Sequence, residues 1–228
     1  MEIISRSNFE RDSILNLASL KHKMLKLLQA EVGLRKHRFQ TQSGVSMPPS
    51  DFLNIPFELL LRFLRKRPKG PWMCRRAVCE LELILKSSNR RLRVLELGGG
   101  SSTKWLLNRS KEVLTIETDP YFADFIVKET LNFSNFTLLV SESIFELLSK
   151  LDRDFDLVII DFNETETINR SEVALYVRDA FPDAIICLDN SDRYLEVSKL
   201  FENYVSKVVV GLVRKPFCAN QTTFFYPM

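Results

Sequence analysis

The sequence predicts an α/β fold built on one seven-stranded, mostly parallel sheet that ends in an antiparallel hairpin. Three observations carry this prediction: strand-like and helix-like segments alternate from Leu92 onward, a glycine turn follows the first strand, and the last connection is short. Only residues 213–221 separate the last two strand-like runs, and Pro216 lies among them. A parallel pair needs a connection of about a dozen residues or more, so we expect this last pair to be antiparallel.

Short runs rich in aliphatic and β-branched residues are predicted as the strands, because no charged residue interrupts most of them and turn residues flank them. They are residues 92–97, 113–117, 136–140, 157–161, 184–188, 207–212 and 222–226. Helices are predicted in most of the gaps, over residues 103–108, 121–131, 144–151, 171–180 and 194–204. Helices between parallel strands cover both faces of a sheet.

The first 90 residues are predicted to form a helical region ahead of the sheet, as a lid or a dimer contact. Apolar residues recur at helical spacing over 12–38, and two further amphipathic segments cover 56–67 and 73–85. The polar stretch 40–49 ends in two prolines and is predicted to be a linker. Residues 91–228 are then expected to form the α/β domain.

Composition is that of an ordinary globular chain with one principal core: of 228 residues, 45% are hydrophobic and 27% are charged. The four cysteines show no CxxC spacing, which favours reduced thiols. The N-terminus lacks the long apolar segment of a signal peptide, so we expect a cytoplasmic protein.

Charge is distributed unevenly along the chain. Residues 1–93 contain 19 Lys and Arg against 8 Asp and Glu, a net charge of +11, whereas the remainder has 13 against 21, a net charge of −8. A basic cluster of this kind can face nucleic acid, an anionic membrane or an acidic substrate. Without an RNA-binding signature, we favour a solvated helix face. The cluster comprises Arg62, Arg65, Lys66, Arg67, Lys69, Arg75 and Arg76.

The turn after the first strand is the strongest functional signal. It reads Glu96-Leu97-Gly98-Gly99-Gly100-Ser101-Ser102-Thr103, the strand, tight loop and helix start that hold a nucleotide-like ligand. Gly98 and Gly100 are predicted to take backbone angles closed to other residues. A nicotinamide fingerprint would need a third glycine where Thr103 stands, and Glu96 would repel its pyrophosphate. The loop therefore argues against a nicotinamide cofactor.

From Arg91 to the C-terminus the sequence resembles the class I S-adenosylmethionine-dependent methyltransferases. That family has a Rossmann-like sheet ending in a hairpin and a Glu/Asp-x-Gly-x-Gly loop, which is Glu96–Gly100 here. The resemblance implies S-adenosyl-L-methionine as cofactor. It implies that Glu96 organises contacts to the ammonium group and that the amides of the loop hold the carboxylate. The loop residues concerned are Gly98, Gly99, Gly100, Ser101 and Ser102.

Residues at the ends of the next two strands extend this implied cofactor site. Glu117 ends the second strand, where the family and dinucleotide folds place a carboxylate on the ribose hydroxyls; capping of the following helix is the alternative. Glu142 and Ser143 follow the third strand and are candidates for the adenine contact, although capping of the helix from Ile144 explains Ser143 equally well.

Asp161 ends the fourth strand, and Asp189 and Asn190 follow the fifth, so all three are expected beside the transferred methyl group. Their placement looks like that of the catechol-type O-methyltransferases, which hold Mg²⁺ with such a set. One departure is Glu164, where those enzymes have a lysine base. The alternative is that Asp161 contacts cofactor or substrate, while Asp189 and Asn190 cap a helix.

The function implied is methyl transfer to an acceptor, expected to be a small molecule, with Asp161 or a metal deprotonating it. Two alternatives stay open. The acidic stretch 161–166 keeps an aminopropyl-transferring enzyme of the same fold in view, and the basic N-terminal region could serve a non-catalytic scaffold that binds a partner. Nucleic acid is a less favoured partner, and a homodimer through the N-terminal helices is a further expectation.

Overall fold

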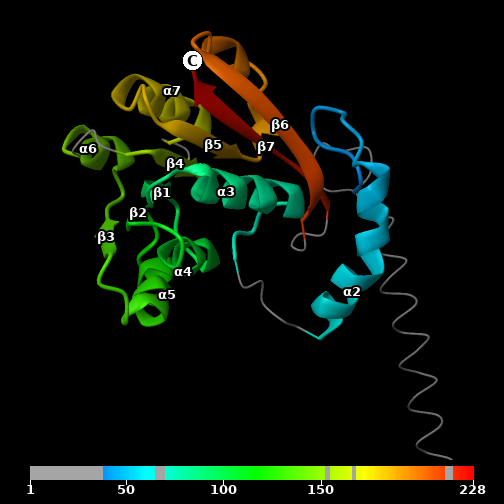
Figure 1. The fold of residues 1–228 in the computed structure, drawn as a ribbon, viewed down its shortest axis with the longest axis horizontal. Helices are drawn as coiled ribbons and strands as arrows, with labels where there is room; N and C mark the ends of the chain where they lie inside the picture. The colour runs from blue at the N-terminus through cyan, green and yellow to red at the C-terminus, as the bar shows by residue number, and fades with distance from the viewer. Residues whose placement is uncertain (1–37, 65–69, 152–154, 166–167, 214–217) are drawn as a thin grey trace, which may run out of the picture.

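The computed structural model describes residues 38–64, 70–151, 155–165, 168–213 and 218–228. Its centre is a seven-stranded sheet in the order β3-β2-β1-β4-β5-β7-β6 (Figure 1). The first five strands pair in parallel, and β7 is antiparallel to both its neighbours. This arrangement confirms the predicted fold class. The strands are β1 (Arg93–Leu97), β2 (Glu112–Glu117), β3 (Phe136–Val140), β4 (Leu157–Ile160), β5 (Ile185–Asp189), β6 (Tyr204–Val213) and β7 (Cys218–Pro227).

The C-terminal hairpin is longer than the sequence predicts. β6 and β7 pair from Tyr204↔Pro227 to Val213↔Cys218, whereas the predicted strands covered 207–212 and 222–226. Near its start, β7 contains Asn220 and Gln221, which are polar but buried in the structure. Polar residues gave no strand signal there, because the pattern that marks a strand is apolar.

The two faces of the sheet are covered by different helices. Beneath α3 (Arg75–Ser87) and α4 (Ser101–Leu107) lies one apolar cluster, and beneath α6 (Ile144–Ser149) and α7 (Arg170–Ala180) lies another. The central strands feed both clusters, because successive side chains point to opposite faces. In β4, Leu157 and Ile159 belong to the first cluster and Val158 and Ile160 to the second. α5 (Pro120–Thr130) packs against α4, β2 and β3.

The described part of the N-terminal region lies against the hairpin. η1 (Pro49–Asn54) leads into α2 (Ile55–Phe63), whose Ile55 and Leu59 pack with Met47, Leu212 and Ala219. The predicted helices 56–67 and 73–85 correspond to α2 and α3. The predicted linker forms a turn closed by the bridge Gln40↔Ser46. The predicted helix 12–38, and any dimer contact through it, lies outside the described residues apart from residue 38.

Two arginines of the basic cluster are paired within the protein. Arg76 Nε contacts Asp51 Oδ1 at 2.9 Å, and Arg75 Nη1 donates to Asn54 Oδ1 at 3.3 Å. Both arginines therefore fit the solvated helix face that the sequence favours. The side chains of the other five members lie outside the described part of the chain.

The prediction of a helix over 194–204 is wrong. Two short 3₁₀ helices, η2 (Ser191–Arg193) and η3 (Val197–Leu200), occupy this part of the chain before β6 begins at Tyr204. The helix-like spacing of Tyr194, Val197 and Phe201 is real, since all three are buried. They reach the core from separate tight turns, so their burial does not need a continuous α-helix.

Candidate active site

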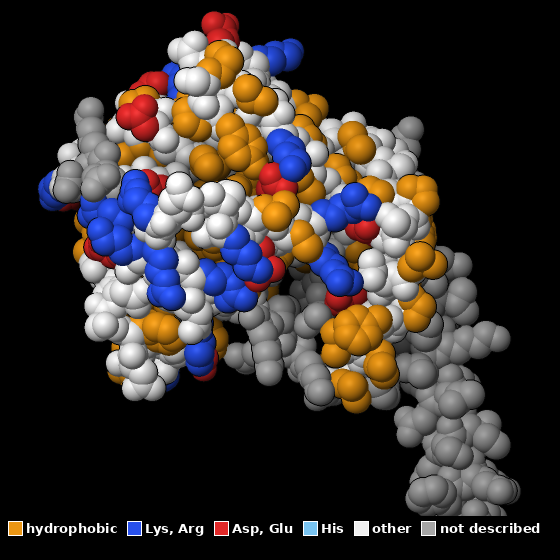
Figure 2. All heavy atoms as spheres, in the orientation of Figure 1, with side chains coloured by type: hydrophobic (Ala, Val, Ile, Leu, Met, Phe, Trp, Pro, Cys, Tyr) orange, Lys and Arg blue, Asp and Glu red, His pale blue; other side chains and the backbone are white. Residues whose placement is uncertain are grey.

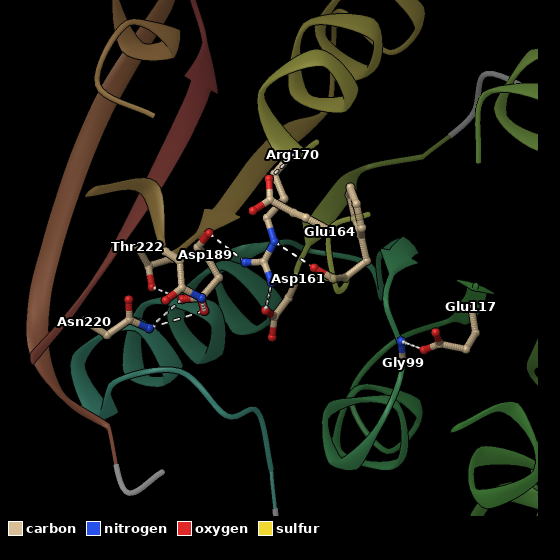
Figure 3. Close-up of polar contacts among 10 residues, drawn as sticks. Gly99, Glu117, Asp161, Glu164, Arg170, Asp189, Asn220 and Thr222 are labelled. Carbon is tan, nitrogen blue, oxygen red and sulfur yellow. Dashed lines mark hydrogen bonds and ion pairs between the residues drawn. The ribbon is translucent and has the colours of Figure 1, made fainter. Parts of the chain in front are cut away.

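Acidic side chains gather at the carboxyl ends of neighbouring strands, on the face of the sheet that α3 and α4 cover. Glu96, Asp161 and Asp189 each come two residues after a strand residue of the core beneath these helices, so all three point to that face. In the register, Asp161 and Asp189 directly follow the paired residues Ile160 and Leu188. Figure 3 shows the two carboxylates on either side of one guanidinium, that of Arg170.

The glycine loop places two glycines in different roles. Gly98 has a φ of +90°, and a Cβ there would lie 2.5 Å from both Asp161 O and the Cα of Phe162. Only glycine fits where the end of β1 approaches the end of β4 this closely. The expectation of special backbone angles at Gly100 is wrong, because its φ of 161° is extended backbone. A Cβ at Gly100 would meet nothing within 4 Å, so it borders open space.

All three glycine amides of the loop are bonded within the protein. Gly98 N donates to Ile116 O at 2.8 Å, Gly99 N to Glu117 Oε2 at 2.9 Å and Gly100 N to Thr103 Oγ1 at 3.0 Å. A ligand carboxylate would therefore meet the amides of the first turn of α4, at Ser101 and Ser102, whose N–H groups have no intrahelical acceptor. The Ser101 hydroxyl itself donates to Gly70 O at 2.7 Å.

Glu96 is fully buried and is fixed by two threonines. Its Oε2 accepts from Thr103 Oγ1 at 2.7 Å and from Thr115 Oγ1 at 2.8 Å. Burial raises the pKa of Glu96 to about 7, although the hydroxyls of Ser102, Thr103 and Thr115 act to lower it. Thr103 thus links Glu96 to the loop, because its hydroxyl donates to Glu96 and accepts from Gly100 N. It stands where a dinucleotide fold has its third glycine. Glu96 stabilises the loop from the buried side, through its bond to Thr103, and has no exposed surface to touch a ligand.

Glu117 holds the loop from the neighbouring strand. Besides the Gly99 amide, it accepts at Oε1 from Thr118 N at 2.8 Å and Asp119 N at 2.9 Å. The cap of α5 is Asp119, which accepts from Tyr121 N at 2.8 Å, so Glu117 is not the helix cap. A carboxylate has about four acceptor positions, which leaves one on Glu117 for a ligand hydroxyl.

Arg170 is the site residue that the sequence analysis missed. It starts α7 and is buried, and its guanidinium donates from Nε to Phe162 O at 2.8 Å and from Nη1 to Asp189 O at 2.9 Å. Its Nη2 lies 3.0 Å from Asp161 Oδ1 (Figure 3). Its sequence signal is weak: a single cation after the acidic stretch that follows β4. Arg170 joins the ends of β4 and β5.

Asp161 is the acid of this group that keeps access to solvent, with 26% of its side chain exposed. Figure 3 shows that its second oxygen points away from Arg170. Burial and the neighbouring Asp189 raise the pKa of Asp161 to about 7, while Arg170 acts to lower it. A carboxylate with a pKa near neutrality and one free oxygen is suited to take up a proton.

Asp189 is buried, and both oxygens of its carboxylate accept hydrogen bonds from neighbouring side chains. Its Oδ1 accepts from Thr222 Oγ1 at 2.7 Å and from Asn220 Nδ2 at 3.0 Å, and its Oδ2 accepts from Asn190 Nδ2 at 2.8 Å. Asn220 and Thr222, on β7, were also missed by the sequence analysis, because polar residues inside a buried strand give no periodic signal. Asn190, at φ 55°, precedes η2 but makes no side-chain cap bond. The capping alternative is therefore wrong for both residues.

No protein-family model matches the chain, and no curated protein matches its sequence. Many solved structures match. Cofactor-bound Rv0187 from MTB superposes with a TM-score of 0.53 at 18% identity, over 78% of this chain and 96% of that one. A proposed O-methyltransferase from Klebsiella pneumoniae gives 0.52 at 18% identity, over 75% and 89%.

A third structure carries a ligand. The N-methyltransferase NodS from Bradyrhizobium japonicum WM9, in complex with S-adenosyl-L-homocysteine, gives a TM-score of 0.51 at 16% identity, over 69% of this chain and 88% of that one. Together with the strand order and the antiparallel hairpin, these matches decide the fold. The chain has the class I methyltransferase fold. At such low identity, the likeness shows the fold alone.

The class I methyltransferase fold here does not carry the predicted Mg²⁺ site at Asp161, Asp189 and Asn190. The guanidinium of Arg170 already supplies the positive charge beside Asp161, and Asp189 accepts from three side chains. Asn190 turns its Nδ2 donor toward Asp189. Within the part of the chain that the structure describes, no group of three or more His, Cys, Asp or Glu could hold a metal ion.

The predicted adenine contacts lie in the expected part of the class I methyltransferase fold. Glu142 and Ser143 are exposed and follow β3, whose last residue Val140 pairs with Glu117. Ser141 Oγ accepts from Ser143 N at 3.1 Å, and Ser143 makes no side-chain cap bond to α6. Both side chains remain candidates for a base contact, next to the strand that ends in Glu117.

Glu96 and Asp161 predict an unusual pH dependence of stability. Folding raises the pKa of Glu96 and of Asp161 to about 7, so both stabilise the fold in their protonated forms. That stability is complete below the unfolded pKa values near 4 and is lost as pH rises through about 7. The free energy of unfolding should therefore fall between pH 5 and pH 8, by up to about 1.4 kcal/mol per pH unit for each group.

Urea unfolding at pH 5.5, 6.5 and 7.5 measures this slope. Glu96→Gln removes the titration of Glu96, and we expect the slope to become flatter. Glu112→Gln is the matched control and should keep the full slope. Glu112 starts β2, its side chain is 39% exposed, and it lies 3.2 Å from Arg93 Nε. A Glu96→Gln protein with the slope of the unchanged chain would contradict the assignment.

Proposed function

We propose that this chain is an S-adenosylmethionine-dependent methyltransferase that acts on a small-molecule acceptor. The observation that supports it most is the position of Asp161, a partly exposed carboxylate with one free oxygen beside the glycine loop. Its main-chain oxygen lies against Gly98, so the position of Asp161 is fixed relative to the glycine loop. Class I methyltransferase structures with bound cofactor products, such as NodS, support the choice of ligand.

The described residues fit the cofactor part by part. The open space at Gly100 leaves room beside the loop, and the first-turn amides at Ser101 and Ser102 suit its carboxylate. The remaining acceptor position on Glu117 suits a ribose hydroxyl, and Glu142 and Ser143 lie where the adenine would follow. A carboxylate, Asp161, faces the expected place of the sulfonium.

When bound, the cofactor would supply a methyl group on a sulfonium, with S-adenosyl-L-homocysteine as the leaving group. The chain holds the acceptor in line with the methyl group. Asp161 takes the acceptor's proton on its free oxygen, and Arg170 keeps the other oxygen fixed. Because the pKa of Asp161 is about 7, a substantial fraction of it is ionised at neutral pH.

Calorimetry of the full chain with S-adenosyl-L-methionine and S-adenosyl-L-homocysteine tests the cofactor. Binding of both is expected, and a folded sample that binds neither would refute the proposal. Turnover is tested by incubating the chain with panels of small hydroxyl, amine and carboxylate acceptors. Release of S-adenosyl-L-homocysteine supports methyl transfer. Release of methylthioadenosine in a parallel incubation with decarboxylated S-adenosylmethionine as the donor would show aminopropyl transfer instead.

Glu117→Gln is expected to weaken cofactor affinity at least tenfold, about 1.4 kcal/mol. The amide retains one oxygen, but its NH₂ group faces backbone donors that the carboxylate now accepts from. Calorimetry measures the change, with Glu112→Gln at the opposite end of β2 as the control. Equal affinity in both variants would remove Glu117 from the site.

A further inference from the structure

α2 has a second apolar face that the described structure leaves uncovered. Ile55 and Leu59 pack inward, whereas Leu53, Phe57, Leu60 and Leu64 are 84%, 57%, 53% and 50% exposed. Phe57 and Leu60 lie on α2, Leu64 directly follows it and Leu53 lies in η1. Their spacing of four, three and four residues is typical of one helix face, and we call these four residues the outer stripe. Figure 2 shows hydrophobic side chains gathered over α2 at the lower right. An exposed apolar group of this kind marks an interaction site.

The stretch of sequence that contains the outer stripe is strongly basic. Residues 49–76 contain seven Lys and Arg against two Asp and Glu, a net charge of +5. One of those acids, Asp51, is paired with Arg76. No acidic residue occurs in the sequence between Glu58 and Glu80. The partner of the outer stripe must therefore accept both large apolar side chains and positive charge.

We propose that the outer stripe docks onto the surface of an anionic lipid membrane. A helix with exposed Leu and Phe on one face suits the headgroup region. When its sequence is also rich in Lys and Arg, apolar burial and attraction to acidic lipids add together there. No helix among the described residues is long and apolar enough to cross a membrane, which agrees with docking at the surface.

Two other occupants fit the observations less well. A second copy of the chain would bring two segments of charge +5 together, and four side chains fall short of the roughly 800 Å² per partner of a standard interface. Nucleic acid would attract the positive charge, but its phosphates offer no apolar surface against which Leu53 or Phe57 could be buried. The lipid surface uses both properties.

Vesicle flotation of the full chain tests the proposal. We expect the protein to float with vesicles of phosphatidylcholine and phosphatidylserine, to stay behind with phosphatidylcholine alone, and to be released by 0.5 M salt, at which the Debye length is only about 4 Å. Leu53→Ser combined with Phe57→Ser should lower the bound fraction at least tenfold. Leu131→Ser is the control, because Leu131 is 74% exposed on a different helix end.

The remaining outcomes would overturn the proposal. These are failure to float with the acidic vesicles, equal binding to neutral vesicles, or an equal loss in Leu131→Ser. Size-exclusion chromatography over a range of concentrations checks the second copy: a dimer that the double variant abolishes would assign the outer stripe to self-association. Calorimetry with S-adenosyl-L-homocysteine on the same variants keeps this result separate from the proposed function, since cofactor binding should not change.

Discussion

Gly98→Ala is expected to lower the free energy of unfolding by about 4 kcal/mol, because two costs add. A residue with a Cβ is strained at the φ of +90° that Gly98 adopts, and that Cβ would lie 2.5 Å from backbone atoms of the β4 end. Backbone cannot rotate away as a side chain can. For a chain of this size, the loss corresponds to a melting temperature lowered by about 8–16 °C.

Gly100→Ala provides the matched control two residues away. The φ of Gly100 is extended and a Cβ there meets nothing within 4 Å, so thermal stability should be nearly unchanged. If the cofactor occupies that open space, the added methyl group should still weaken its binding. Thermal melts and calorimetry of the two variants thus separate the folding role of the loop from its binding role. Equal melting temperatures would contradict the close approach at Gly98.

The contrast between these glycines shows what the sequence could predict. The three-glycine loop, its strand and the hairpin at the C-terminus all leave local signals: a run of apolar residues, a turn of small ones, or a connection too short for a crossover. Which glycine is required depends on the end of β4, about 60 residues later in the chain, where Asp161 and Phe162 pass. No local pattern carries that contact.

The polar groups of the site show the same limit. The sequence placed Asp161, Asp189 and Asn190 together correctly, but it left open whether they are three metal ligands, or a contact to cofactor or substrate followed by a helix cap. Their partners come from other elements: Arg170 from α7, and Asn220 and Thr222 from the start of β7. Because side-chain pairing across 31 to 33 residues has no periodicity, the bonding of the Asp189 carboxylate to Asn220 and Thr222 was not predictable.

Asp161→Asn is expected to reduce methyl transfer by about 100- to 10,000-fold, the usual contribution of a positioned general base. The amide oxygen can still accept from Arg170, so the junction of β4 and β5 should hold. Binding of S-adenosyl-L-homocysteine, which has no sulfonium charge, should change little. Steady-state turnover with an acceptor from the panel measures the loss, and Asp124→Asn, on the exposed side of α5, is the control.

The pH profile separates a base from a residue that merely shapes the pocket. With the pKa of Asp161 near 7, turnover of the unchanged chain should rise as pH increases through 7, because only the ionised carboxylate accepts a proton. In Asp161→Asn the residual turnover should lose that rise. If the variant keeps both the rise and its midpoint, the proton goes elsewhere and Asp161 is a positioning residue. If it loses the rise but retains product binding, the free oxygen of Asp161 is the base.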